Sequence, residues 1–174
     1  SFDSPVPTKI VVFAQPSDFH QFMSNRRIGG VFAQSMRENA IALSYGKGID
    51  PAAITKVVFT HAHPDHIWAT VGAGGALNFP NAAYYCAAAE WDFWMGKDIL
   101  TQMPKEMHPF VLGAQKHLNG AKDRVTMVKP GDDIVSGIRV LDTSGHTPGH
   151  VSFEVTGDDG LIIVGDAIGL PAMY

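Results

Sequence analysis

The chain has 174 residues, of which 45% are hydrophobic and 17% charged, and it carries a formal net charge of −4. This composition excludes a disordered chain, and the length suits one domain with its own core. The acidic balance argues against a nucleic-acid partner, and no apolar run approaches the ~20 residues of a membrane-spanning helix. The single cysteine, Cys86, excludes an internal disulfide and is expected to be a small buried side chain. The chain starts at Ser1 without the features of a signal peptide, so the compartment of this soluble protein stays open between cytoplasm and periplasm.

The first third of the chain is expected to hold a β-rich run at 9–13, a helix at 31–45 and a buried strand at 56–60. The helix is indicated by apolar side chains at spacings of three and four, namely Phe32, Met36, Ala40 and Leu43. Residues 67–77 are expected to be partly helical, with three glycines loosening the segment.

The rest of the chain changes from helix to strand. We expect a strand at 83–87, a helix at 88–95, and helical tendency over 98–118 with breaks at Pro104 and Pro109. The last third is expected to contain four short strands separated by glycine-rich turns, at 124–128, 138–143, 151–155 and 161–165.

Five of the eight histidines fall in two short clusters. The first cluster, Thr60-His61-Ala62-His63-Pro64-Asp65-His66, directly follows the strand at 56–60. Alternate residues of an extended chain point the same way, so His61 and His63 can aim at one point. Pro64 then turns the chain, which lets Asp65 and His66 face a second position nearby. Imidazole and carboxylate groups are ligands of zinc, iron and manganese, so this pattern predicts a metal site rather than a solvated loop.

The second cluster, Gly145-His146-Thr147-Pro148-Gly149-His150, follows the strand at 138–143. One of its histidines could complete a three-histidine site, and the other could hydrogen-bond beside it or face a substrate. Asp166 ends the strand at 161–165, where a carboxylate could bridge two metals.

These three motifs, in this order and approximate spacing, resemble the metallo-β-lactamase superfamily over about residues 29–170, with 1–28 unassigned. Residues 77–94 and 136–150 are similar to the branch that contains methyl parathion hydrolase and related lactonases and esterases. The resemblance implies an α/β fold, the αβ/βα sandwich, in a single domain over residues 1–174. It also implies that His61, His63 and His146 bind a first metal, that Asp65 and His66 bind a second, and that Asp166 bridges both. Asp65, which could orient a hydroxide or carry a proton, and His150, which would hydrogen-bond near the site, are the candidate catalytic groups.

The implied activity is that of a metal-dependent hydrolase. Two metals, zinc or alternatively manganese, iron or cobalt, would share a hydroxide that attacks an ester, lactone or organophosphate. The expected partner is therefore a small ester-like molecule. A thioester hydrolase of the glyoxalase II type, a β-lactamase and a non-catalytic metal-binding fragment remain alternatives.

The resemblance also calls for one more metal-binding histidine well after Asp166, and the sequence reaches Tyr174 without it. We therefore expect an incomplete, C-terminally truncated sandwich with one strongly held metal at His61, His63 and His146 and a weak second position. Such a chain would expose apolar surface, which a homodimer or an exchange of elements would hide.

Several aromatic and histidine side chains have no assigned role. Trp68, two residues after His66, is expected near the metals, whereas four other apolar side chains are expected in the core: Phe93, Trp94, Met107 and Phe110. The isolated histidines are expected at surface or helix-face positions; they are His20, His108 and His117.

Overall fold

The computed structural model of the chain describes residues 10–13, 30–35, 38–43, 51–156 and 160–167. The first six strands are β1 (Ile10–Phe13), β2 (Gly30–Ser35), β3 (Glu38–Leu43), β4 (Lys56–Val58), β5 (Ala83–Ala87) and β6 (Val125–Val128). The last four are β7 (Asp133–Val135), β8 (Ile138–Asp142), β9 (Val151–Val155) and β10 (Leu161–Ile163). The α-helices are α2 (Pro64–Ile67), α3 (Ala88–Trp94), α4 (Ile99–Gln102) and α5 (His108–Ala121). Short 3₁₀ turns are η1 (Pro51–Ala53), η2 (Lys105–Met107), η3 (Lys122–Arg124) and η4 (Gly165–Ala167).

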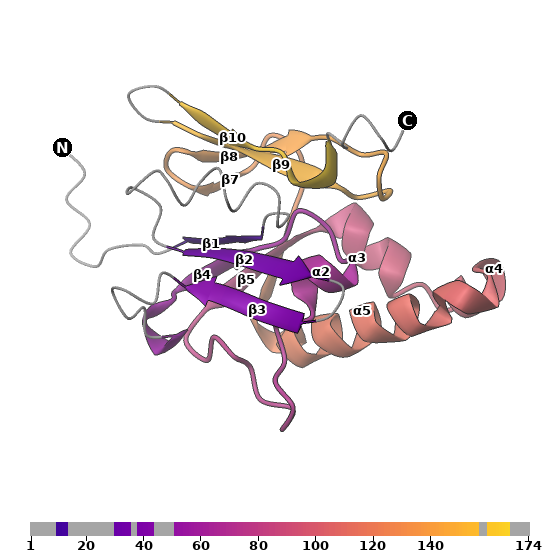
Figure 1. Cartoon of the computed structure of the whole chain (residues 1–174). Coiled ribbons are helices and arrows are strands. Elements are labelled where there is room, and N and C mark those ends of the chain that lie inside the picture. The colour runs from indigo at the N-terminus through magenta and orange to yellow at the C-terminus, as the bar shows by residue number, and fades with distance from the viewer. Residues whose placement is uncertain (1–9, 14–29, 36–37, 44–50, 157–159, 168–174) are drawn as a thin grey trace.

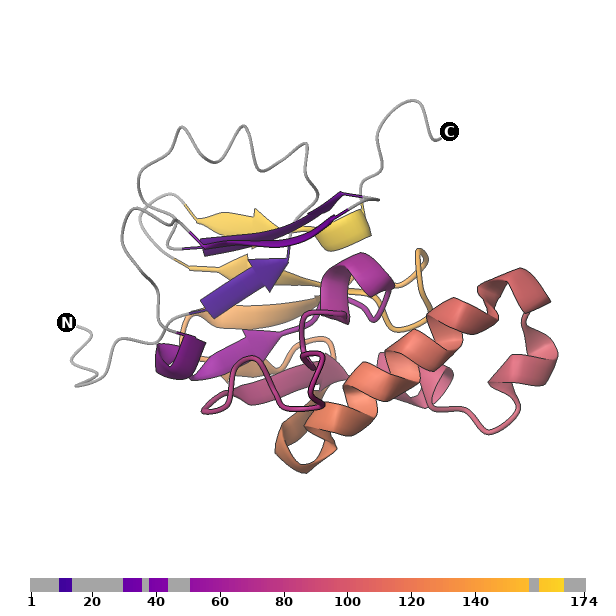
Figure 2. The same ribbon diagram turned by 60° about the horizontal axis from the view of Figure 1, so that its bottom comes forward.

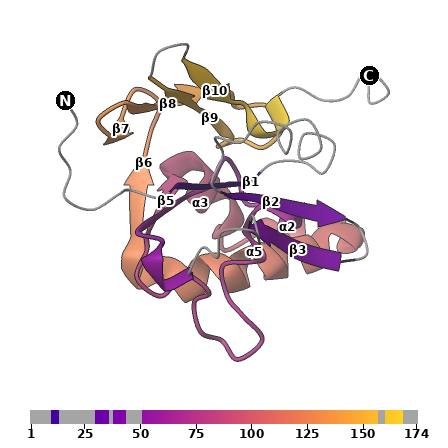
Figure 3. The same cartoon turned by 60° about the vertical axis from the view of Figure 1, so that its left-hand side comes forward.

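The strands form two sheets that lie face to face (Figure 1). The larger sheet has six strands in the order β3-β2-β1-β4-β5-β6, and the smaller has four in the order β10-β9-β8-β7. Strands β1, β4, β5 and β6 are parallel, whereas the smaller sheet is antiparallel throughout. Figure 2 shows α5 across the face of the larger sheet that is turned away from the smaller one. Figure 3 shows β6, at the edge of the larger sheet, leading toward the smaller sheet.

Two hydrophobic clusters hold these layers together. Because neighbouring residues of a strand face opposite sides of the sheet, β4 sends Val57 toward the helices and Val58 toward the smaller sheet. The helix-side cluster includes Tyr84, Trp94 and Leu118. The cluster between the sheets is built around Val140, Val151 and Phe153 of the smaller sheet. Strand β4 therefore packs on both of its faces, which anchors the start of the loop that follows it.

The prediction of a helix at 31–45 is wrong. In its place β2 and β3 form an antiparallel pair, with Val31 opposite Ala42 and Phe32 opposite Ile41. Strand β2 also pairs in parallel with β1. Backbone partners on both sides of β2, from β1 and from the adjacent strand β3, override the weak helical preference of this segment.

Three further expectations need correction. Helical structure ends at Ile67, and beyond it Val71 and Leu77 form an isolated bridge rather than a helix. Pro109 does not break α5 but lies in its first turn, where a backbone N–H would have no hydrogen-bond partner within the helix, so its absence costs nothing. Strand β7 was not anticipated, because it lies in what reads as a turn segment. The strands expected at 56–60, 83–87, 124–128, 138–143, 151–155 and 161–165 and the helix at 88–95 are present, some of them shortened at their ends.

Two expectations about single positions have clear outcomes. Cys86 is fully buried, as predicted, and burial raises the pKa of its thiol. Phe110 is 38% exposed, so the prediction that it packs in the core is wrong. His20 lies outside the described residues. Within the described part of the chain, no helix combines the length and apolar character needed to cross a bilayer.

Candidate metal centre

His61 and His63 lie in the segment between β4 and α2, and their rings converge as the sequence predicts. His61 Nε2 lies 3.1 Å from His63 Nδ1, and the backbone at His63 is extended, with φ −67° and ψ 157°. His61 is fully buried, and its Nδ1 lies 3.1 Å from the hydroxyl of Thr60. When Nδ1 donates its proton to Thr60, the lone pair of Nε2 faces His63.

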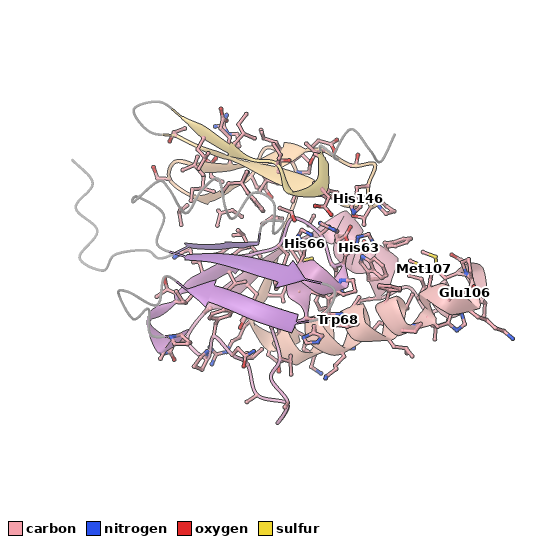
Figure 4. All side chains as sticks on the ribbon, viewed as in Figure 1. His63, His66, Trp68, Glu106, Met107 and His146 are labelled. Carbon is pink, nitrogen blue, oxygen red and sulfur yellow. The ribbon has the colours of Figure 1, made fainter. Side chains whose placement is uncertain are left out.

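His146 completes a group of three imidazoles from a loop far along the chain. Its Nε2 lies 3.0 Å from His63 Nδ1, which is the same atom that faces His61 (Figure 4). A ring nitrogen carries either one proton or one lone pair, so a single hydrogen bond cannot account for both short contacts at His63 Nδ1. A tetrahedral zinc with bonds of about 2.0–2.1 Å separates its ligands by roughly 3.3 Å. The spacing of these nitrogens fits a bound metal ion.

Asp166 lies at the centre of a second group. Its Oδ2 is 3.6 Å from His61 Nε2, 3.4 Å from His66 Nε2 and 3.3 Å from His146 Nε2. The ligand atoms of His61, His66 and Asp166 all lie within 4.8 Å of one another, as do those of the three-histidine group. Asp166 therefore stands between the two groups. The side chain of Asp65 lies outside the described part of the structure.

Burial favours the neutral form of His61 and of His150. Desolvation lowers the pKa of His61 far below its ordinary value, and the neighbouring imidazoles lower it further. Burial also lowers the pKa of His150. A metal binds the neutral imidazole, so His61 offers its lone pair without first releasing a proton at neutral pH.

His150 is fully buried and has both ring nitrogens engaged. The backbone N–H of Asp166 donates to His150 Nε2 at 3.0 Å, so the ring proton of the neutral form lies on Nδ1. Nδ1 then donates to Thr143 Oγ1 at 2.8 Å, the Thr143 hydroxyl to Ser152 Oγ at 2.9 Å, and the Ser152 hydroxyl to the carbonyl of Val164 at 3.1 Å. This chain of hydrogen bonds fixes one tautomer of His150 and holds the backbone at Asp166.

Gly165 makes that contact possible. Its φ of +54° is a conformation that side chains disfavour, and a Cβ there would lie 2.8 Å from His150 Nε2. Glycine therefore lets the chain pass close enough to His150 for the following carboxylate to enter the centre.

The comparisons with known proteins agree with this arrangement. The model of the metallo-β-lactamase superfamily matches residues 30–173. The chain belongs to this superfamily. The predicted α/β fold of the metallo-β-lactamase type is thereby confirmed.

Three individual proteins are similar to this chain over about half of their own length. YobT, an uncharacterized protein of Bacillus subtilis (strain 168), is 28% identical over 114 residues, which are 66% of this chain and 46% of YobT. The crystal structure of AbOPH, a hydrolase in the beta lactamase superfamily, has 30% identity, a TM-score of 0.66 and covers 75% of this chain. AidC, a dizinc quorum-quenching lactonase, has 26% identity, a TM-score of 0.67 and the same coverage. The chain spans about half the length of these relatives, 48% of AbOPH and of AidC.

The aromatic neighbour of this metallo-β-lactamase centre is Trp94 rather than Trp68. The Trp94 ring lies 5.5 Å from that of His63, and it is buried in the core as predicted. Trp68 instead stacks at 6.3 Å on His117 of α5, although the sequence favoured it as a neighbour of the metals (Figure 4). The short helix α2 ends at Ile67, and the chain beyond it turns toward α5.

Glu90 is a further residue of the site, and no sequence motif indicates it. Its side chain is fully buried in the first turn of α3, between the two histidine-bearing loops. Residues 88–95 carry two carboxylates, Glu90 and the exposed Asp92, and no feature of this segment marks Glu90 as the buried one. A buried carboxylate needs a set of hydrogen-bond donors. The identity of those donors depends on residues up to 59 positions away, and no local pattern shows them.

Proposed function

We propose that this chain forms the metal-binding part of a zinc-dependent hydrolase that cleaves a small ester-like molecule, such as an ester, lactone or organophosphate. The observation that carries the proposal is the convergence of imidazole nitrogens and a carboxylate oxygen within 4.8 Å in two overlapping groups. The similarity to AidC supports it, since AidC is a dizinc lactonase solved with the product N-hexanoyl-L-homoserine.

In this proposal each metal position has its own ligands. His61, His63 and His146 hold the first metal, Asp65 and His66 hold the second, and Asp166 serves both, which gives two zinc ions per intact site. The same ligand types accept manganese, iron or cobalt. When bound, the metal supplies Lewis acidity and a water that ionises near neutral pH.

The remaining residues act by holding the ligands in place. Thr60 orients the His61 ring through its Nδ1. Both nitrogens of His150 are engaged within the protein, so we assign it to positioning Asp166 rather than to proton transfer. Asp65 keeps its proposed role of orienting the attacking group or carrying a proton.

The substrate class follows from two sequence stretches, 77–94 and 136–150, which resemble the methyl parathion hydrolase and lactonase branch. They favour esters, lactones and phosphotriesters over thioesters and β-lactams. The expectations of a homodimer, and of no nucleic-acid or membrane partner, stay predictions.

The test is hydrolysis by the full chain loaded with zinc or manganese. The substrates are an N-acyl homoserine lactone, an aryl ester and a phosphotriester, with a thioester and a β-lactam as comparisons. We expect turnover of at least one of the first three. The control is His146→Ala, a partly exposed position with a side chain 33% accessible, where the core stays intact. Replacing a residue that only hydrogen-bonds to a metal ligand typically lowers metal affinity or activity about 10–100-fold. Loss of the ligand itself should therefore lower the rate at least ~100-fold.

Two outcomes contradict the proposal. Turnover confined to the thioester or the β-lactam would move the protein to one of the alternative activities. No turnover of any substrate by the metal-loaded chain would favour a non-catalytic metal-binding role.

A further inference from the structure

Glu90 accepts four hydrogen bonds, two on each carboxylate oxygen. Oε1 accepts from the backbone N–H of Ala62 at 2.8 Å and from Trp94 Nε1 at 2.6 Å. Oε2 accepts from the Thr147 hydroxyl at 2.6 Å and from the backbone N–H of Gly149 at 3.1 Å. With its side chain fully buried, the carboxylate depends on these donors in place of water.

The donors come from both histidine-bearing loops. Ala62 lies between His61 and His63, and Thr147 directly follows His146. One oxygen of Glu90 therefore holds the first loop and the other holds the second. A backbone hydrogen bond from the Val151 N–H to the Thr60 carbonyl, 2.9 Å long, also joins the two segments. Thr60 precedes His61 and Val151 follows His150, so this bond does not lie between His63 and His146.

The second loop is seated closely on α3 at this point. A Cβ on Gly149 would lie 1.9 Å from the backbone nitrogen of Glu90. Loop and helix are thus in contact at backbone level, which leaves the carboxylate little freedom to shift between the loops.

We propose that Glu90 is a positioning residue that sets the separation of the two histidine loops and thereby the affinity of the three-histidine site for its metal. The inference rests on the proposed metal site. His63 Nδ1 lies 3.1 Å from His61 Nε2, in the same loop, and 3.0 Å from His146 Nε2, in the other loop, so a small change in loop spacing alters the fit of the three nitrogens to one ion. Glu90 itself is hydrogen-bonded to backbone and side chains around the ligands and does not enter either ligand group.

Three variants of the full chain separate positioning from general stability. Glu90→Gln keeps the size of the side chain but replaces one acceptor oxygen by an amide NH2 group. Because that group is itself a donor, it opposes the two donors that face this oxygen. Thr147→Val removes a single buried hydroxyl that reaches one loop. Tyr84→Phe is the matched control, because it also removes one buried hydroxyl hydrogen bond, from Tyr84 to the Phe79 carbonyl, away from the ligand groups.

The measurement is the dissociation constant of zinc by competition with a chromophoric chelator, with urea unfolding in parallel and the visible spectrum of the cobalt form as a second readout. We expect Glu90→Gln to weaken zinc binding about 10–100-fold and Thr147→Val by a smaller factor. Tyr84→Phe should leave affinity unchanged at a similar loss of stability. The cobalt spectrum should change in the two Glu90-linked variants and not in Tyr84→Phe.

The outcomes divide cleanly. Wild-type zinc affinity in folded Glu90→Gln overturns the inference, and if that variant does not fold, wild-type affinity in Thr147→Val overturns it instead. Loss of affinity in Tyr84→Phe in proportion to its stability also overturns it, because the effect would then be general. A wild-type chain that binds no zinc or cobalt overturns the proposed metal site itself, and the inference with it.

Discussion

Gly149 is the position where one added carbon should disturb the centre most. An alanine there would place its Cβ 1.9 Å from the Glu90 nitrogen, 2.4 Å from Glu90 Cα and 2.6 Å from the Ala89 carbonyl carbon. All three are backbone atoms, so no side-chain rotation relieves the overlap. The φ of Gly149 is not positive, so the effect of Gly149→Ala is steric rather than conformational. Loop and helix must separate by about 1 Å or more to restore ordinary contact.

The cost of that separation follows from two contributions. Overpacking of a close contact costs about 1–3 kcal/mol, and loss of the Gly149 hydrogen bond to the carboxylate costs about 1.5–3 kcal/mol. We expect Gly149→Ala to lower the free energy of unfolding by roughly 4 kcal/mol. Gly74→Ala is the control, since a Cβ there meets nothing within 4 Å and should change stability by less than about 0.5 kcal/mol.

The assay is urea unfolding of the full chain followed by tryptophan fluorescence, at one metal concentration for every variant. A difference below about 1 kcal/mol between Gly149→Ala and Gly74→Ala would refute the close seating of the second loop on α3.

Three other predictions follow from the same structure. Burial and the neighbouring Lys116 lower the pKa of His117 to about 4, and its neutral ring accepts the Val71 N–H. The unfolded chain therefore binds the extra proton, and stability should fall as pH drops from about 6.5 to about 4, by up to about 1.4 kcal/mol per pH unit. Urea unfolding at several pH values should show a flatter profile for His117→Asn than for the unsubstituted chain. Thr143→Val interrupts the series of hydrogen bonds that fixes His150. It should lower the free energy of unfolding by about 1–3 kcal/mol and weaken zinc binding, measured by competition with a chelator. Unchanged values of both would contradict the tautomer assigned to His150. With zinc present at a concentration one hundred times its dissociation constant, removal of the metal with a chelator should lower the free energy of unfolding by about 2.7 kcal/mol. A thermal unfolding temperature that does not change with added zinc would contradict a metal site.

Two kinds of site residue could be predicted from the sequence: those whose geometry is local, and those whose motifs resemble a known family. His61 and His63 share one short extended segment, so their convergence follows from strand geometry alone. His146 and Asp166 were found because each follows a recognisable strand, and the order of the motifs resembles a known family. Strands β5, β8 and β9 were also readable, since each is a short β-rich run bounded by turns.

The parts that sequence could not predict depend on distant partners. The pair β2 and β3 contains good helix formers and becomes a sheet because β1 and the opposite strand supply backbone partners. The burial of His117 depends on Val71, 46 residues away, and the four donors of Glu90 include two from the second loop. Trp94 lies in the core as expected and also beside His63, whereas Trp68 stacks on His117, because α2 is a single turn that ends at Ile67.

The most direct test of the three-histidine centre is anomalous diffraction at the zinc absorption edge from crystals of the full chain grown with zinc. The account predicts a strong peak shared by His61 Nε2, His63 Nδ1 and His146 Nε2, with a weaker one beside His66 and Asp166. A zinc peak elsewhere, with no density between those three nitrogens, would contradict it.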